Sequence, residues 1–436
     1  MSTATQSFAR QGAVGDKASD SERVQKAMQS FAHDFGAQVA LNIESCIHCG
    51  MCSEACHFYI ATEDAKYTPI LKVEPFKKAF RRESGAFAPF FKLLNLKSKV
   101  TVDELEEWQE LMFDSCNQCG RCSLVCPMGI EIAELIEIGR RGMFEAGLAP
   151  RELADRAHYQ AEHGQPEESE KPYPKLLAEI AAKHEIDIAI DKSRADVFVC
   201  APRSDMLQNP SAVAAMAKVL NKLKVNYTFS SNAIVAENYG YYAGSRGLQK
   251  TISLRIIDAA RKVGAKIVLV PECGHAYSAL RWQAAELLGE ELPFKVRHVT
   301  EFLAEKLADG KLKLNKVDGT ATAFHDPCQI VRKGGVMDAP RALMKAMGVN
   351  LKEMANHQGY SFCCGGGGGV NDLERSKPLR YKAQELKLNE IDATGARRFL
   401  TSCSDCRVAF DDAREHFNWD KQPESLVELV ANNIKE

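Results

Sequence analysis

Eight of the cysteines fall into two groups whose spacing suits metal binding. The stretches CIHCGMCSEAC and CNQCGRCSLVCP both follow the pattern C-x2-C-x2-C-x3-C. They supply Cys46, Cys49, Cys52 and Cys56 in the first group, and Cys116, Cys119, Cys122 and Cys126 in the second. Gaps of two residues let three thiolates converge on one centre while backbone amides point at its sulfur atoms. Such groups hold iron and sulfur, or zinc.

The doubled pattern favours iron–sulfur clusters over structural zinc. Its spacing is that of bacterial two-cluster ferredoxins, in which the fourth cysteine of each group ligates the other cluster. We therefore expect two cubane [4Fe-4S] clusters, although zinc sites also use C-x2-C pairs. His57 follows Cys56 where proline is usual, which we expect to change packing and not ligation. Because four thiolates leave no open position on iron, these clusters predict an electron relay, with chemistry elsewhere.

A third set centres on Cys363 and Cys364, which are adjacent and stand directly before five glycines. The pair could form a strained vicinal disulfide, remain ordinary buried thiols, or bind separate irons, and the context favours the last. Neighbouring side chains diverge, which suits an elongated cluster better than a cube. Gly365 and Gly366 would let the backbone approach such a cofactor closely. A nucleotide-binding loop is disfavoured because the order G-x4-G-K-[ST] is absent.

With Cys328, Cys403 and Cys406 the pair completes the pattern C-x34-CC-x38-C-x2-C, which resembles the CCG-domain family over residues 195–436. The resemblance implies one noncubane [4Fe-4S] cluster held by these five cysteines. Including the two preceding groups, the order resembles heterodisulfide reductase D-type subunits and their counterparts in sulfite-reduction-associated membrane complexes. That family implies electron exchange between a membrane-bound cytochrome b or quinone partner and a disulfide, trisulfide or persulfide substrate, free or on a small carrier protein.

The C-terminal part also contains an internal repeat. Cys200 in VFVCAP and Cys273 in PECGHA match Cys328 and Cys403, at intervals of 73 (273 − 200) and 75 (403 − 328) residues. In the first copy the offset of the adjacent pair falls on Val235 and Ala236. Because the first copy has lost that pair, splitting of a heterodisulfide by two noncubane clusters is not expected.

Three residues of this region are candidates for chemistry beside the cluster. If they face the second repeat, Cys273 could form a mixed disulfide or ligate iron, and His275 could protonate a leaving thiolate. An ordinary packed Cys/His pair is the alternative. His325, just before Cys328, could tune the cluster by hydrogen bonding, donate a proton, or act as a structural cap. Cys200, in an apolar strand, reads as a small buried residue.

The elements around these motifs divide the chain. A helix over SERVQKAMQSFAHDFG precedes the first cysteine group, and apolar runs alternating with helical patterns predict α/β units later on. We predict an α+β multi-domain protein in which a helical two-[4Fe-4S] ferredoxin-like domain precedes a pseudo-twofold pair of α/β CCG domains. The expected parts are a polar extension and helix (1–40), the ferredoxin-like domain (41–160), a linker (161–175), a degenerate first CCG domain (176–320) and a second one with the noncubane cluster (321–436).

Composition narrows the setting. The 436 residues carry a formal charge of −2, which argues against a nucleic-acid binder working through overall charge. The first forty residues lack an apolar targeting core and no long apolar run occurs, so we expect a cytoplasmic protein held peripherally at the inner membrane by a complex. Residues 72–99 interleave basic and phenylalanine side chains, and we expect them to contact a membrane-bound partner. Internal pairing with the acidic segment 101–114 is the alternative.

Three functions follow from these patterns. The favoured one is an iron–sulfur oxidoreductase subunit that moves electrons between a membrane cytochrome and a sulfur–sulfur bond. The second is the electron-relay subunit of a flavin-dependent 2-hydroxy acid or glycerol-3-phosphate dehydrogenase. The third is a non-redox zinc scaffold. A substrate-reactive thiol at Cys273 would indicate the first function, and an inert first repeat the second.

Overall fold

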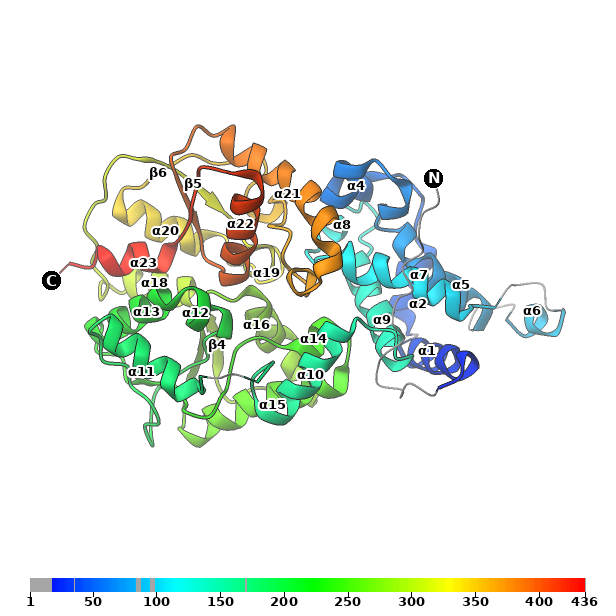
Figure 1. Ribbon diagram of the computed structural model, residues 1–436, viewed down its shortest axis with the longest axis horizontal. Helices are drawn as coiled ribbons and strands as arrows, with labels where there is room; N and C mark the ends of the chain where they lie inside the picture. Colours follow the sequence, from blue (N-terminus) through cyan, green and yellow to red (C-terminus); the bar gives the residue numbers. More distant parts are fainter. Residues whose placement is uncertain (1–17, 35, 84–87, 95–98, 169–170, 436) are drawn as a thin grey trace.

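The computed structural model describes residues 18–34, 36–83, 88–94, 99–168 and 171–435, so the polar stretch 1–17 lies outside it. Figure 1 shows the N-terminal helices, in blue and cyan, beside two α/β units that lie one against the other. Each unit contains a four-stranded parallel sheet. This confirms the predicted α+β class, while the exact domain boundaries stay a prediction.

The N-terminal part is a helical bundle. Its helices are α1 (Asp20–Asp34), α2 (Ala37–Glu44), α3 (Met51–Ala55), α4 (His57–Thr62), α5 (Glu74–Glu83), α6 (Ala88–Leu94), α7 (Val102–Gln109), α8 (Arg121–Leu124) and α9 (Ile132–Glu145). The helix predicted before the first cysteine group is α1. Phe31 of α1 packs edge-on against Phe76 and Trp108, with ring centroids 5.2 and 5.8 Å apart. This aromatic core fixes the helices that carry the cysteine motifs.

The two cysteine motifs fold alike. Gly50 and Gly120 occupy the position before α3 and α8, with φ of 81° and 73°, in the left-handed region that suits glycine. Each glycine turns the chain so that the third cysteine of its motif lies in the helix that follows. The shared C-G-x-C step therefore has a backbone reason as well as a ligand reason.

Two helices connect the bundle to the sheets. They are α10 (Arg151–His163) and α11 (Tyr173–Lys183). The predicted linker thus covers the end of α10 and the start of α11. Helix α10 packs against α14 and α15 of the first α/β unit.

The first α/β unit has the strand order β2-β1-β3-β4. Its elements are β1 (Val197–Val199), α12 (Arg203–Gln208), α13 (Pro210–Lys222), β2 (Tyr227–Thr228), α14 (Tyr239–Ala243), α15 (Arg246–Lys262), β3 (Ile267–Val270), α16 (Gly274–Ser278), α17 (Ala284–Leu288), β4 (Lys295–His298) and α18 (Val299–Ala308). The chain runs from one parallel strand to the next through helices, as parallel pairing requires.

The second unit repeats this order as β6-β5-β7-β8. Its elements are β5 (Ala321–His325), α19 (Cys328–Val331), α20 (Asp338–Met347), β6 (Asn350–Leu351), α21 (Lys377–Asp392), β7 (Arg398–Thr401), α22 (Ser404–Phe417), β8 (Pro423–Ser425) and α23 (Leu426–Asn432). Val199 and Leu269 of the first sheet share one core with Phe324 and Leu400 of the second. The two units therefore fold against each other and not as separate beads.

The structure corrects the alignment of the repeat by three residues. Arg203 opens the helix after β1, and Cys328 opens the helix after β5, each directly after a proline. Arg203 therefore stands where Cys328 stands in the second unit, and Cys200 stands where His325 stands. Counted from Arg203, the interval between the second unit's ligands (363 − 328 = 35) reaches Asn238 (203 + 35). Matching cysteine to cysteine misled the sequence alignment, because position in the strand–turn–helix unit decides the register.

The basic segment 72–99 packs inward over its first half. Phe76 and Phe80 are buried, and Lys78 forms an ion pair with Glu104 of the acidic segment. Trp108 also donates a hydrogen bond to the backbone carbonyl of Lys72. The prediction that this whole segment faces a membrane-bound partner is therefore wrong for α5, where the alternative of internal pairing holds.

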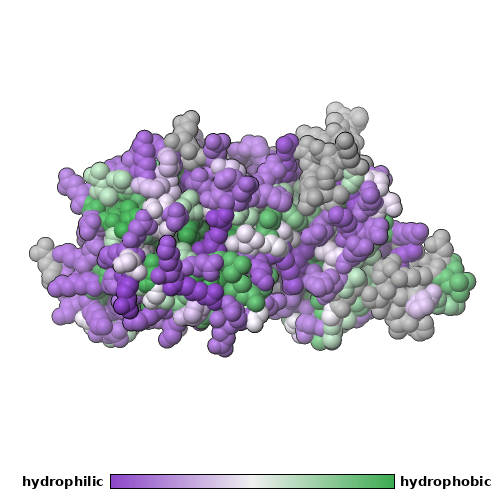
Figure 2. Space-filling model, turned by 90° about the horizontal axis from the view of Figure 1, so that it is seen from below, coloured by the Kyte–Doolittle hydropathy of each residue, from purple (hydrophilic) through white to green (hydrophobic). Residues whose placement is uncertain are grey.

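Helix α6 is the exposed part of that segment. Leu93 and Leu94 are 83% and 50% exposed, whereas Phe87 and Lys97 lie outside the described residues. Figure 2 shows a largely hydrophilic face with hydrophobic side chains at the end of the molecule where α6 projects in Figure 1. In the described ranges, no helix combines the length and the apolar character needed to cross a bilayer.

Candidate functional site

The first cavity of interest lies near the surface of the bundle. It is lined by Cys46, Cys49, Cys52 and Cys126, so that the last cysteine of the second motif joins the first three of the first motif. Cys49 is exposed, and Ile47 and Met128 on the rim are 62% and 46% exposed. A four-sulfur centre here would be open to a partner.

A second cavity lies deeper and takes the converse set. It is lined by Cys56, Cys116, Cys119 and Cys122. Burial, followed by the nearby Cys119 and Cys116, raises the pKa of Cys122 well above its ordinary value. Four thiols around each cavity fit a cubane cluster, which would hold them as thiolates. The two cavities exchange their fourth cysteines, while ligation itself stays a prediction.

Five thiols are gathered in the core of the second α/β unit. Cys328, Cys363, Cys364, Cys403 and Cys406 are each 2–6% exposed. Their side chains are hydrogen-bonded in the order Cys328, Cys363, Cys364, Cys406, Cys403. The hydrogen bonds from Cys363 and Cys406 lower the pKa of Cys364 to about 6. Contiguous thiols from three separate elements form the donor set that an elongated cluster needs.

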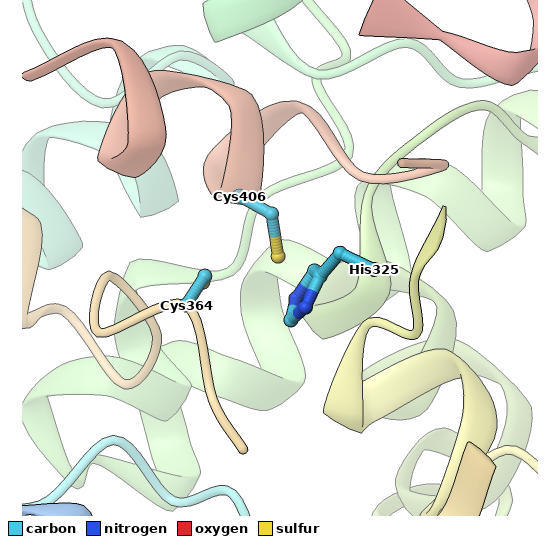
Figure 3. Close-up of side chains that lie close together, drawn as sticks. All are labelled: His325, Cys364 and Cys406. Carbon is cyan, nitrogen blue, oxygen red and sulfur yellow. The ribbon is translucent and has the colours of Figure 1, made fainter. Parts of the chain in front are cut away.

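His325 completes this set. Figure 3 shows its ring at the end of β5 converging with Cys364 and Cys406, and the three candidate ligand atoms lie within 4.8 Å of one another. The side chain is fully buried, and among the described residues neither ring nitrogen has a hydrogen-bond partner. An unsatisfied buried polar group costs about 1–3 kcal/mol. Sulfur atoms of a bound cluster would supply the missing acceptor, so the residues fit the group that the five-cysteine pattern implies.

The glycine loop, residues 363–369, is held by all three parts of the protein. Asn117 of the bundle donates to the Gly365 carbonyl at 2.6 Å, and Arg140 donates to the Gly368 carbonyl at 2.7 Å. His275 of the first α/β unit accepts from the Gly368 amide at 3.0 Å. A Cβ added at Gly366 would lie 2.4 Å from the side chain of Asn371. Two vicinal cysteines thus need a bare backbone because three domains close directly on it.

The second cavity and the five thiols are neighbours. Arg332, which follows the α19 helix that begins at Cys328, donates to the Cys119 carbonyl at 2.5 Å. Gln329 donates to the Gln118 carbonyl at 2.7 Å. Cys119 lies close enough to Cys328 for their charges to interact. These contacts join the inner cubane cavity of the bundle to the core of the second unit.

The structure brings Cys273 and His275 to the interface between the two repeats. Cys273 is fully buried, and burial raises its pKa well above the ordinary value. His275 lies with Nδ1 3.6 Å from the Asp405 carboxylate while Nε2 accepts from the glycine loop. Both ring nitrogens are therefore occupied in holding the loop, whereas the catalytic roles considered for Cys273, His275 and His325 stay predictions. Cys200 is buried as expected.

Sequence reasoning missed a polar pocket beside the cluster set. The pocket has a volume of about 240 Å³ and is lined by α12, α14, the glycine loop and α22. Glu237, just before α14, lines it and is 5% exposed. A single glutamate in the stretch VAENYG carries no sequence signal, and only the corrected register of the repeat could have pointed to it.

Comparison with known proteins gives two domain matches. Residues 42–130 match the 4Fe-4S dicluster domain, and residues 322–411 match the cysteine-rich domain named CCG. The chain is a CCG-domain protein of the heterodisulfide reductase D type. The second match covers Cys328, Cys363, Cys364, Cys403 and Cys406, and the first covers all eight cysteines of the bundle.

Relatives of this CCG-domain protein are oxidoreductases. It is 28% identical to the D-type polypeptide of the dihydromethanophenazine:CoB–CoM heterodisulfide reductase of Methanosarcina mazei, covering 90% of this chain and 94% of that one. It is 25% identical to Hdr-like menaquinol oxidoreductase iron-sulfur subunit 2 of Archaeoglobus fulgidus, over 90% and 80% of the two chains. It is 26% identical to EtfAB:quinone oxidoreductase of Syntrophomonas wolfei, over 87% of this chain and 56% of the relative. The CCG-domain protein is accordingly an iron–sulfur oxidoreductase.

Proposed function

We propose that the protein moves electrons between a membrane-bound cytochrome b or quinone partner and a sulfur–sulfur bond, through two cubane clusters and one noncubane cluster. The observation that carries this proposal is the position of Cys119 beside both Cys328 and Cys363, where the inner cubane cavity meets the five buried thiols. The names of the relatives, which include a heterodisulfide reductase and a menaquinol oxidoreductase, support it.

Burial sets the order of the relay. Cys49 of the outer cavity is exposed, the cysteines of the inner cavity are intermediate, and the five thiols of the CCG unit are buried. When bound, the clusters supply one-electron carriers along this line. We propose that the partner docks over the outer cavity, where Ile47, Met51 and Met128 are 62%, 45% and 46% exposed. Such docking would keep the protein peripheral on the cytoplasmic side of the inner membrane.

The residues beside the five thiols divide their roles. We propose that His275 positions the glycine loop, because both of its ring nitrogens are engaged. His325 would donate a hydrogen bond to the cluster, because its nitrogens are buried without partners among the described residues. Burial keeps Cys273 protonated at neutral pH, so it would react with a substrate sulfur only after a neighbouring group removes its proton.

An anaerobic redox titration followed by EPR tests the proposal. The purified protein is titrated with and without a disulfide or thiol, and wild type is compared with Cys363→Ala and with Cys200→Ala as a buried-thiol control. We expect a substrate-dependent signal in wild type and in the control that vanishes in Cys363→Ala. Two cubane signals that do not respond to any substrate would overturn sulfur chemistry at this centre.

A relay role within a larger dehydrogenase is the second candidate. The observation in its favour is the first repeat, where Arg203 stands in place of the ligand Cys328 and Asn238 in place of Cys363. Similarity to EtfAB:quinone oxidoreductase supports it as well. Under this candidate the clusters would reduce a quinone-linked acceptor but show no turnover with disulfides, which the same titration detects.

A further inference from the structure

The polar pocket occupies the place where the first repeat would have its own cluster. Arg203 stands at the position of Cys328, and Asn238 and Tyr239 stand at the positions of the adjacent cysteines. Arg203 and Tyr239 both line the pocket. A metal site in one repeat has thus been replaced by a cavity in the other, within one shared fold.

The pocket adjoins the five thiols. Its lining includes Gly366, two residues after Cys364, and Asp405, the residue before Cys406. Only the backbone of the glycine loop and the first turn of α22 separate the cavity from the sulfur atoms. A small molecule in the pocket would therefore lie next to the redox centre.

Glu237 is an acid held ready in this pocket. Its Oε1 accepts a hydrogen bond from the Ser204 amide at 3.1 Å, and its backbone carbonyl accepts one from Gln160 at 2.6 Å. Its Oε2 is buried and has no partner among the described residues. Burial is the main cause that raises the pKa of Glu237 to about 7, and the nearby Asp405 adds to it. The carboxyl group can therefore hold a proton near neutral pH and exchange it with the pocket.

We propose that Glu237 is the proton donor and acceptor for the substrate sulfur, and that the pocket takes the sulfur-bearing end of a neutral or cationic disulfide. This inference rests on the proposed function. In the reducing direction, two electrons that arrive singly from the cytochrome or quinol break the S–S bond and leave two thiolates. Glu237 gives its proton to one thiolate, and water protonates the other and then Glu237, so that one disulfide, two electrons and two protons give two thiols. In the oxidising direction the Glu237 carboxylate accepts the proton.

The charges around the pocket define the substrate class. Both lining arginines are paired, Arg156 with Asp372 and Glu167, and Arg203 with Glu167. With Glu237 and Asp405 the described lining holds four carboxyl groups against two guanidinium groups. A sulfonate, phosphate or carboxylate next to the disulfide would meet these acids without an unpaired cation. A volume of about 240 Å³ is also below the range of pockets that enclose a drug-sized ligand, so only one end of the substrate enters.

The titratable groups that face Glu237 come from every neighbouring element. They are Arg203 and Asp205 on α12, Asp405 on α22, Tyr239 and Tyr242 on α14, Cys200 after β1 and Cys273 before α16. Burial raises the pKa of both tyrosines and of both thiols above their ordinary values. Glu237 is therefore the group in this set expected to titrate near pH 7 in the pocket.

Anaerobic turnover with reduced methyl viologen tests the proposal. Three small disulfides are compared: bis(2-hydroxyethyl) disulfide, cystamine, and bis(2-sulfonatoethyl) disulfide. We expect wild type to reduce the neutral and cationic compounds at least about tenfold faster than the anionic one, because the lining acids repel it. The Glu237→Gln variant should lose roughly 100-fold in kcat on the neutral disulfide, the usual size of general acid catalysis. The wild-type rate should fall as pH rises through about 7, and this dependence should be absent in Glu237→Gln.

Matched variants make each outcome decisive. Glu237→Asp should keep the pH dependence at a lower rate, and Glu424→Gln, a distant carboxyl in β8, should behave as wild type. Iron and sulfide content and electron uptake from viologen should be unchanged in all of them. If wild type reduces disulfides and Glu237→Gln does so equally well at every pH, the role of Glu237 is overturned. Preference for the anionic disulfide would overturn the substrate class, and absence of disulfide turnover in wild type would overturn the proposed function itself.

Discussion

The side-chain amide of Asn117 donates a hydrogen bond to the carbonyl oxygen of Gly365 at a distance of 2.6 Å. Asn117 follows Cys116 in the inner cubane cavity, and Gly365 follows Cys364 in the five-thiol set. The Oδ1 of Asn117 pairs with His57 Nε2 at 2.8 Å, and His57 follows Cys56. One amide side chain thus connects two cysteines of one redox site with the adjacent pair of the next.

Replacement of Asn117 by alanine should weaken this junction. The variant leaves the carbonyls of Gly365 and Gly367 and the ring of His57 without their partner, so we expect a loss of about 1–3 kcal/mol in unfolding free energy. Stopped-flow reoxidation should also show slower electron transfer from the cubanes to the paired-cysteine centre. Asn221→Ala, which removes an exposed hydrogen bond, is the control. Equal stability of the two variants would contradict the prediction.

Removal of the imidazole of His325 should shift the potential of the paired-cysteine centre. A donated hydrogen bond stabilises the more negative, reduced state, so His325→Ala should lower the reduction potential. One hydrogen bond of roughly 1 kcal/mol corresponds to a shift on the order of 50 mV for one electron. EPR-monitored titration measures this shift, and His325→Gln, which keeps an N–H donor, should restore most of it. A potential that is the same in all three proteins would argue that His325 is only a structural residue.

Arg407 should be essential for the contact between the two α/β units. Its guanidinium lies 2.8 Å from Asp205 and 2.8 Å from Glu272, and all three side chains are almost fully buried. Arg407→Met leaves two carboxyl groups in a dry interface, which we expect to cost about 3–5 kcal/mol. Guanidinium-induced unfolding of the anaerobic protein measures the loss. The surface variant Arg414→Met should change stability by less than about 0.5 kcal/mol, and a similar effect of both would refute the role of the buried pair.

Stability should fall with rising pH because of Glu237. Its pKa is about 7 in the fold against 4.5 for an ordinary glutamate, so the fold favours the protonated form. This contribution is fully present below about pH 4.5 and is lost as pH rises through about 7, for a total of roughly 3 kcal/mol. Unfolding free energies at pH 4.5 and 8 should therefore converge for Glu237→Gln relative to wild type. A wild-type stability that does not change relative to the variant would mean that the carboxyl is solvated.

The sequence predicted what local spacing determines. The two C-x2-C-x2-C-x3-C motifs each form a turn at glycine and a short helix, so their cysteines converge through neighbouring residues. The repeat was recognised, but Cys200 was matched to Cys328 although it stands at the position of His325. That error arose because a shared residue type is weaker evidence than a shared place after a strand.

Contacts between distant segments could not be predicted in the same way. Lys78 and Glu104 lie 26 residues apart, and Asn117 and Gly365 lie 248 apart. Glu237 becomes significant only because the fold buries it beside Asp405 and leaves one of its oxygens unpaired among the described residues. Such relationships depend on packing between domains, for which a single sequence carries no periodic signal.

The closure of three domains on the glycine loop also constrains how the protein is made. The five thiols are at most 6% exposed, and the loop beside them is covered by Asn117 and Arg140 of the bundle. Preassembled iron and sulfur cannot enter a site that is sealed in this way. We therefore expect the maturation machinery to load the C-terminal unit before the N-terminal bundle docks, so that the order of domain closure becomes the order of biogenesis.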